Sequence, residues 1–192
     1  MKLVLATGNK GKIAEFRDAL ADFDIELVAA FELGLNDFPE ETGSSYEENA
    51  LIKANYITEQ SGLNALADDS GLELIALNNE PGIYSARYGG ISDSKLRNEY
   101  LLKKLQGKTD RSAKFVSSLV LTRANLPYQA FAGEVHGTII DDPQGQEGFG
   151  YDPIFYCPEL KKTFAQATKA EKRTVSHRGR AIAKFLAYLK SL

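Results

Sequence analysis

The chain has 192 residues, of which 43% are hydrophobic and 26% charged, the composition of an ordinary globular domain with enough apolar side chains for a core. One cysteine and two histidines, at Cys157, His136 and His177, exclude a disulfide framework, a cysteine-rich zinc site and a three-histidine zinc. The apolar runs are too short to span a membrane and Met1–Val4 lacks a signal-peptide layout, so we expect a cytoplasmic protein without a membrane partner.

The net charge of −3 conceals an uneven distribution. Residues 161–190 carry nine lysines and arginines against the single acid Glu171, a local charge of +8, so the remaining residues sum to −11. A basic tail and an acidic body favour an anionic ligand held between them, with a metal on the acidic side. A solvated basic helix face is the alternative.

The first half of the chain alternates strands with helices. Ile13, Phe16 and Leu20 recur at helical spacing, and Ser45 with Glu48 fits a capping box. We expect strands at 2–6, 25–30, 65–67 and 72–77, and helices at about 12–21, from 45 to a stop at Gly62, and at 96–105.

The second half of the chain predicts a hairpin and a final helix. Alternating Phe115, Ser117, Leu119 and Leu121 indicate a strand at 113–123, which turns back into 128–134 and a further strand at 135–140. Apolar spacing places a last helix near 176–190. No repeat or linker divides residues 1–192, so the pattern predicts one domain of mixed α/β or α+β type, a sheet with helices packed around it.

A candidate phosphate site lies where the first strand meets the first helix. The segment Thr7-Gly8-Asn9-Lys10-Gly11-Lys12 offers glycines for close backbone approach, two lysines and the exposed N–H groups of a helix start. Its spacing is neither a Walker A loop nor a Rossmann fingerprint, and a plain turn is the alternative.

Two acidic pairs are candidate ligands for Mg²⁺. Asp68-Asp69-Ser70-Gly71 follows a predicted strand, and Glu40-Glu41-Thr42-Gly43 stands beside a glycine turn. Hard carboxylate oxygens suit Mg²⁺, which shares its shell with waters and substrate phosphates, and one carboxylate can take a proton from a metal-bound water. Two polar turns that cap backbone groups are the alternative.

Three further segments are candidates for nucleotide contacts. Asn49 and Lys53 share a helix face and can reach phosphate, although a surface pair is the simpler interpretation. Phe149-Gly150-Tyr151-Asp152-Pro153 combines an aromatic ring for stacking with a hydrogen-bond acceptor. Lys172 and Ser176-His177-Arg178 supply donors for a carbonyl oxygen or a phosphate. The segment 81–89 can line a pocket or bury Tyr84 and Tyr88 against a partner chain.

Taken in order, these motifs resemble the inosine triphosphate pyrophosphatase family, whose bacterial members are XTP/dITP pyrophosphatases. The resemblance rests on T-G-N-x-x-K, A-D-D-S-G, F-G-Y-D-P and S-H-R and covers nearly the whole chain. It implies an elongated mixed β-sheet flanked by helices, two lobes around a central active-site cleft, and a homodimer without a stable nucleic-acid partner.

The resemblance also implies roles for single residues and a reaction. Glu40 and Asp69 would bind Mg²⁺, with Asp69 also the catalytic proton acceptor. Metal-activated water would attack at the α–β phosphate junction of dITP, ITP or XTP, releasing a nucleoside monophosphate and pyrophosphate and cleansing the nucleotide pool. The implied substrate contacts are Thr7, Gly8, Asn9, Lys10, Gly11, Lys12, Lys53, Ser70, Phe149, Gly150, Tyr151, Asp152, Lys172, His177 and Arg178.

Base selection is expected to depend on the 6-oxo group of hypoxanthine or xanthine, which accepts hydrogen bonds where adenine presents an amino donor. Leaving buried polar groups unpaired costs about 1–3 kcal/mol each. Two alternatives remain open at this stage. One is a nucleotide- or RNA-binding module without catalysis, and the other is a Mg²⁺-dependent pyrophosphatase for modified pyrimidine nucleotides.

Overall fold

The computed structural model describes residues 1–191 and groups them into two compact units. Unit 1 comprises residues 1–69, 117–132 and those from Ala181 onward, and unit 2 comprises residues 70–116 and 133–180. Strands β3, β4 and β5 and helix α5 contribute residues to both units.

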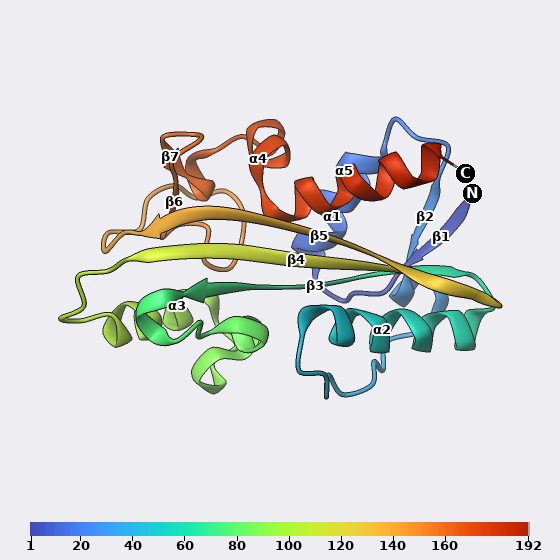
Figure 1. The fold of residues 1–192 in the computed structure, drawn as a ribbon, viewed down its shortest axis with the longest axis horizontal. Helices are drawn as coiled ribbons and strands as arrows, with labels where there is room; N and C mark the ends of the chain where they lie inside the picture. Colours follow the sequence, from blue (N-terminus) through green and yellow to red (C-terminus); the bar gives the residue numbers. More distant parts are fainter. Residues whose placement is uncertain (192) are drawn as a thin grey trace. The chain divides into compact units, whose positions relative to one another are not determined.

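The helices and strands are drawn in Figure 1. The strands are β1 (Lys2–Leu5), β2 (Glu26–Ala29), β3 (Asn64–Leu74), β4 (Ser112–Arg123), β5 (Leu126–Ile139), β6 (Phe155–Cys157) and β7 (Lys162–Thr163). The α-helices are α1 (Lys10–Leu20), α2 (Tyr46–Ser61), α3 (Ser94–Lys104), α4 (Lys169–Val175) and α5 (His177–Lys190), with 3-10 helices at Ala30–Leu33, Ile75–Leu77, Gly82–Gly90 and Phe164–Gln166.

The sheet is mixed, as the sequence predicts, with strand order β2-β1-β3-β4-β5-β6-β7. β1 runs parallel to both β2 and β3, with Leu3 opposite Leu27 and Val4 opposite Ala65. β6 pairs antiparallel with β5 and β7. The mixed α/β class is therefore confirmed.

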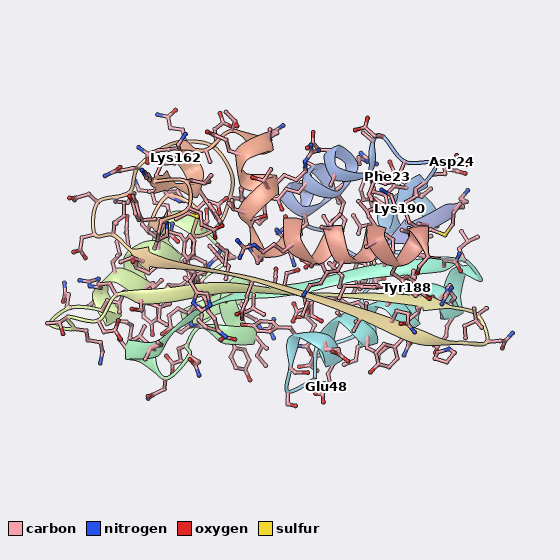
Figure 2. The ribbon with its side chains drawn as sticks, turned by 45° about the horizontal axis from the view of Figure 1, so that its top comes forward. Phe23, Asp24, Glu48, Lys162, Tyr188 and Lys190 are labelled. Atoms are coloured by element: carbon pink, nitrogen blue, oxygen red, sulfur yellow. The ribbon has the colours of Figure 1, made fainter. Side chains whose placement is uncertain are left out.

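Unit 1 buries both faces of its parallel strands. Leu3 and Leu5 pack with Phe16 of α1 and Phe185 of α5, whereas Val4 packs with α2. In Figure 1 α1 and the last turns of α5 lie on one side of these strands and α2 on the other. Burial on both faces explains the uninterrupted apolar run at the start of the chain. Lys190 at the end of α5 lies over the ring of Phe23, 5.6 Å from its centroid (Figure 2).

Unit 2 has an aromatic core. The rings of Phe115 on β4 and Phe155 on β6 lie 4.6 Å apart between centroids, and Phe164 stacks on Phe115 at 6.0 Å. Leu101 and Leu105 of the α3 region complete this cluster, and both are fully buried. Complete burial of one such side chain stabilises the fold by about 1.5–3 kcal/mol.

Several predicted boundaries are wrong. β3 continues through residues 68–71, where the sequence predicts a turn, and ends at Leu74, before the predicted limit of 77. The predicted strands at 128–134 and 135–140 are one strand, β5. Helix α1 begins at Lys10, earlier than predicted, because Asn9 caps it by accepting a hydrogen bond from the Lys12 amide.

The sequence does not predict the short elements β6, β7 and α4, because they have too few residues to show a period. Among residues 1–191, no helix is long and apolar enough to cross a membrane.

Candidate active site

The loop between β1 and α1 presents the start of a helix to solvent. Thr7 is buried, and its hydroxyl oxygen accepts a hydrogen bond from the Asn9 amide at 3.2 Å. Asn9 Oδ1 in turn accepts from the Lys12 amide at 3.1 Å. Gly8, Asn9 and Lys10 are exposed, whereas Gly11 is half-buried. The loop therefore suits an anion at the positive end of α1.

Lys12 turns back from this loop toward β3. Its Nζ lies 2.7 Å from Asp68 Oδ2 and 3.3 Å from the Asp68 carbonyl oxygen. Asp68 Oδ1 accepts a hydrogen bond of 2.5 Å from the Ser117 hydroxyl, and the Asp68 side chain is fully buried. The sequence predicts that Asp68 follows a strand, which is wrong: Asp68 lies inside β3 and pairs with Lys12.

Lys53 of α2 is buried among acidic groups. Its Nζ donates to Glu41 Oε1 at 2.7 Å and to the Asp68 carbonyl oxygen at 3.1 Å, and lies 3.5 Å from Asp69 Oδ1. Burial lowers the pKa of Lys53, but the charges of Asp69, Glu41 and Asp68 outweigh it and raise the pKa overall. Lys53 therefore remains a cation at neutral pH.

The two carboxylate oxygens of Asp69 have different surroundings. Burial raises the pKa of Asp69, although the nearby charges of Lys53 and Lys12 oppose the shift. Its Oδ2 is buried and has no hydrogen-bond partner among the described residues. A buried carboxylate oxygen without a donor is costly unless it serves a ligand, a proton or a metal ion.

Hydrogen bonds attach the acidic turn, residues 40–43, and the following Ser44 to the start of α2. Asn49 Oδ1 accepts from the Gly43 amide at 2.8 Å, and Glu48 Oε2 accepts from the Ser44 amide and hydroxyl at 2.6 and 2.8 Å. Glu48 stands at the start of α2 (Figure 2). Asn49 is fully buried, so the surface-pair interpretation of Asn49 and Lys53 is wrong. Glu40 itself is exposed.

A divalent cation fits the chemistry of these carboxylates. No group of three His, Cys, Asp or Glu side chains in residues 1–191 is arranged as a metal site. Mg²⁺ does not require one, because it keeps several waters and takes further oxygens from substrate phosphates. The unpartnered Asp69 Oδ2 and the nearby acidic turn supply oxygens of the right kind.

Unit 2 holds a second polar cluster, around Asp152. Lys172 Nζ donates to Asp152 Oδ2 at 2.7 Å and lies 5.0 Å from the ring centroid of Phe149. The Phe149 amide donates to the same Oδ2 at 2.9 Å. Asp152 and Lys172 are both buried, and Phe149 is half-buried. This places a cation, a carboxylate and an aromatic ring together.

His177 and Arg178 begin α5 and are buried. The His177 ring stacks on Phe115 with centroids 4.7 Å apart. Arg178 Nη2 donates to the Ser70 hydroxyl at 2.8 Å, and its guanidinium lies 5.8 Å from the centroid of Phe149. The two motifs F-G-Y-D-P and S-H-R, with Ser70, thus meet in unit 2.

The structure therefore gathers the predicted residues into two clusters. Unit 1 brings together Lys12, Lys53 and Asp69 with the two acids of the predicted pairs to which the resemblance assigns no role, Glu41 and Asp68. The sequence does not predict that Asn49 holds the acidic turn, which it does by accepting a hydrogen bond from the Gly43 amide. Tyr88 is buried by its own unit, with its hydroxyl 2.7 Å from Glu80 Oε2, and Tyr84 is exposed.

Comparison with known proteins gives consistent matches. The Ham1 family model matches residues 3–188. A dITP/XTP pyrophosphatase of Thermus thermophilus is 49% identical over 95% of this chain and 88% of its own, and one of Haemophilus influenzae is 49% identical over 94% and 95%. The solved Ham1 protein of Staphylococcus aureus has a TM-score of 0.89 at 43% identity, covering 100% and 99% of the two chains. A HAM1 protein of Coxiella burnetii has a TM-score of 0.90 at 39% identity, covering all of both chains.

Proposed function

This chain belongs to the Ham1 family, and we propose that it is a Mg²⁺-dependent nucleoside triphosphate pyrophosphatase that hydrolyses dITP, ITP and XTP to the monophosphate and pyrophosphate. The observation that carries the proposal is the environment of Asp69: a buried carboxylate with an unpartnered Oδ2, 3.5 Å from the Lys53 ammonium through its other oxygen. A module that only binds nucleotides has no use for such a group.

Asp69 is suited to accept a proton. The raised pKa makes it a stronger base than an ordinary aspartate while Lys53 keeps its second oxygen in place. The water oxygen forms a bond to the α-phosphorus as the bond between the α-phosphorus and the oxygen that bridges to the β-phosphate breaks. The proton passes to Asp69, and pyrophosphate leaves.

The cations of unit 1 stabilise the developing negative charge. Lys12 is fixed by the buried Asp68 carboxylate and Lys53 by the half-buried Glu41 carboxylate, so they need no reorganisation when charge appears on the leaving pyrophosphate. The exposed amides at the start of α1 bind the phosphates. Glu40 and Asp69 would hold Mg²⁺, which, when bound, supplies Lewis acidity toward phosphate and water.

The cluster of unit 2 is suited to the base. The Phe149 ring can stack on a purine, and Lys172 and Arg178 are donors for the 6-oxo oxygen of hypoxanthine or xanthine. Adenine presents an amino group at the same position, which would face these donors with another donor and form no hydrogen bond with them. Removal of non-standard purines from the nucleotide pool by a cytoplasmic homodimer is the biological role we propose.

Chromatographic product analysis tests the reaction. Purified protein is incubated with Mg²⁺ and, separately, dITP, XTP, dATP, dGTP and a pyrimidine triphosphate. We expect monophosphate and pyrophosphate from dITP and XTP, with little from the others. Release of single phosphate would overturn the cleavage position, and preference for the pyrimidine would favour the alternative substrate class.

A single substitution separates enzyme from binder. Asp69→Asn keeps the shape of the side chain but removes the proton acceptor, so turnover is expected to fall by about 10² or more while nucleotide binding persists. Glu59→Gln, an exposed change on α2, serves as the matched control. Full turnover in Asp69→Asn would contradict the assigned role.

A further inference from the structure

Two adjacent polar residues of α3, Arg97 and Asn98, are buried in unit 2. Burying a guanidinium and an amide is unfavourable unless they form hydrogen bonds. Arg97 Nε and Asn98 Oδ1 have no partner among the described residues, so the partners of the other nitrogens indicate what the two side chains hold. Neither residue belongs to the motifs that carry the family resemblance.

Arg97 contacts the backbone of the segment before α3. Its Nη1 lies within hydrogen-bond distance of three backbone carbonyl oxygens, those of Ala86 at 2.9 Å, Ile91 at 3.0 Å and Ser92 at 3.0 Å. The guanidinium also lies 5.5 Å from the ring centroid of Tyr151. Arg97 therefore contacts both the segment 86–92 and the turn that contains Tyr151.

Asn98 holds the backbone of that turn directly. Its Nδ2 donates to the Gly150 carbonyl oxygen at 3.0 Å. A second bond reinforces the attachment, because the Tyr151 hydroxyl donates to the Ser85 carbonyl oxygen at 2.9 Å. Ser85 is itself fixed, since its hydroxyl oxygen accepts from the Leu72 amide at 2.8 Å.

The turn held by Asn98 carries Phe149, assigned to stack on the base, and Asp152, which holds the donor Lys172. Gly150 has a φ of +64°, a left-handed conformation that glycine adopts at little cost. Phe149 precedes it, and Asp152 follows two residues later and accepts from Lys172. A shift of the Gly150 carbonyl would move the Phe149 ring and the Asp152 carboxylate together.

We propose that Asn98 is a positioning residue for base selection: by holding the Gly150 carbonyl, it fixes the Phe149 ring, which stacks on the base, and the Asp152 carboxylate, which holds Lys172, a donor that distinguishes a 6-oxopurine from adenine. The inference rests on the proposed function. It assigns to α3 a part in substrate choice, although Asn98 itself need not touch the nucleotide.

The test compares steady-state kinetics of wild type and two variants with dITP and dATP. Asn98→Leu keeps the approximate shape but removes the donor, and Asn98→Ser removes most of the side chain. For both we expect KM for dITP to rise about tenfold and the ratio of kcat/KM between dITP and dATP to fall about tenfold, the effect of one lost buried hydrogen bond. Leu96→Ala, an exposed change on the same helix, is the control and should leave both values unchanged.

These readouts separate positioning from mere stability. A variant that only lowers the folded fraction reduces apparent kcat equally for both substrates and leaves KM and the ratio intact. Folded variants with wild-type KM and ratio would overturn the proposal, as would failure of both variants to fold, because Asn98 would then be structural. If wild type hydrolyses neither nucleotide, the proposed function fails instead, independently of Asn98.

Discussion

Lys12 and Asp68, 56 residues apart in the sequence, form an ion pair of 2.7 Å between Nζ and Oδ2 in which the carboxylate is fully buried. The pair links the first turn of α1 to the middle of β3. The sequence suggests Lys12 as a phosphate ligand and Asp68 as a metal ligand. In the structure, the Asp68 carboxylate orients the Lys12 ammonium. Asp68 contributes to the site by orienting a cation.

Removing Asp68 should be strongly destabilising. Asp68→Ala leaves the Lys12 ammonium partly buried without its carboxylate, and breaking a buried ion pair costs about 3–5 kcal/mol. Urea unfolding measures this loss. Ser117→Ala removes only the hydrogen bond to Asp68 Oδ1 and should cost less, about 1.5–3 kcal/mol. Equal losses in the two variants would show that the ion pair adds nothing.

Glu40 and Glu41 are expected to affect activity differently. Glu41→Gln weakens the 2.7 Å contact with Lys53, so KM for the triphosphate should rise while the Mg²⁺ concentration for half-maximal activity stays constant. Glu40→Gln removes the exposed carboxylate assigned to the metal and should raise that concentration about tenfold, since one oxygen ligand is weakened. Mg²⁺ titrations at saturating dITP measure both. The reverse pattern would transfer the metal role to Glu41.

Gly43 is predicted to tolerate no side chain. A Cβ at this position would lie 2.7 Å from Asn49 Oδ1 and 2.7 Å from the Glu48 Cβ. Gly43→Ala should therefore displace the acidic turn, and misplacing catalytic groups by about 1 Å can cost 10²-fold in rate. We expect kcat/KM for dITP to fall by at least about tenfold. Thr42→Ala, an exposed neighbour, is the control, and equal rates in both variants would argue that the turn need not be fixed.

The sequence predicts the main elements of the fold because their periodicity is strong. Leu3 belongs to a short apolar run that ends at a turn and Phe16 to a pattern of helical period, and both are fully buried. It fails at residues 68–71, where two acids, a serine and a glycine have the composition of a turn. There Lys12 and Ser117 satisfy the Asp68 carboxylate, so tertiary contacts override the local preference for a turn.

The sequence predicts which residues form the site but not which of them form hydrogen bonds or ion pairs with one another. The motif A-D-D-S-G identifies Asp68 and Asp69 together, yet one is saturated with donors and the other keeps an unpartnered oxygen. Which partner reaches Asp68 depends on α1 and β4, because Lys12 and Ser117 lie 56 and 49 positions away in the sequence. The sequence does not predict the role of Asn98 for the same reason, because its partner Gly150 lies 52 positions later.

Glu171 should make stability depend on acid pH. Hydrogen bonds from the Thr168 amide, from Lys162 and from the Thr168 hydroxyl lower the pKa of Glu171 to about 2, from an ordinary value of 4.5. A lowered carboxyl pKa stabilises the fold fully above the unfolded value and ceases to do so as pH falls through the folded value. Glu171→Gln should thus lower the melting temperature at pH 7, and the difference from wild type should shrink between pH 4.5 and 2.

Melting curves at pH 7, 4.5 and 3 measure this difference. Glu99→Gln, an exposed change on α3, provides the control for the loss of one negative charge. A difference between wild type and Glu171→Gln that stays constant over the whole range would contradict the pKa shift. The capping box at Thr168 begins α4, so the same variant reports on the helix that carries Lys172.

Gly179 permits the close contact between α4 and α5. A Cβ there would lie 1.8 Å from the Arg173 carbonyl oxygen and 3.2 Å from the Ser176 hydroxyl oxygen. Gly179→Ala must therefore push the two helices apart, and overpacking of this kind costs about 1–3 kcal/mol. Since His177 and Arg178 lie in the same turn, KM for dITP should rise as well. Urea unfolding and steady-state kinetics measure the two effects.

Gly8 supplies the matched control for stability, because a Cβ there would meet nothing within 4 Å and its backbone is not left-handed. Gly8→Ala should change the free energy of unfolding by less than about 1 kcal/mol. A Gly179→Ala variant as stable as Gly8→Ala would mean that the Arg173 carbonyl can move away freely. In that case the first turn of α5 would be positioned by the stacking of His177 on Phe115, whose ring centroids lie 4.7 Å apart, and not by the contact with α4.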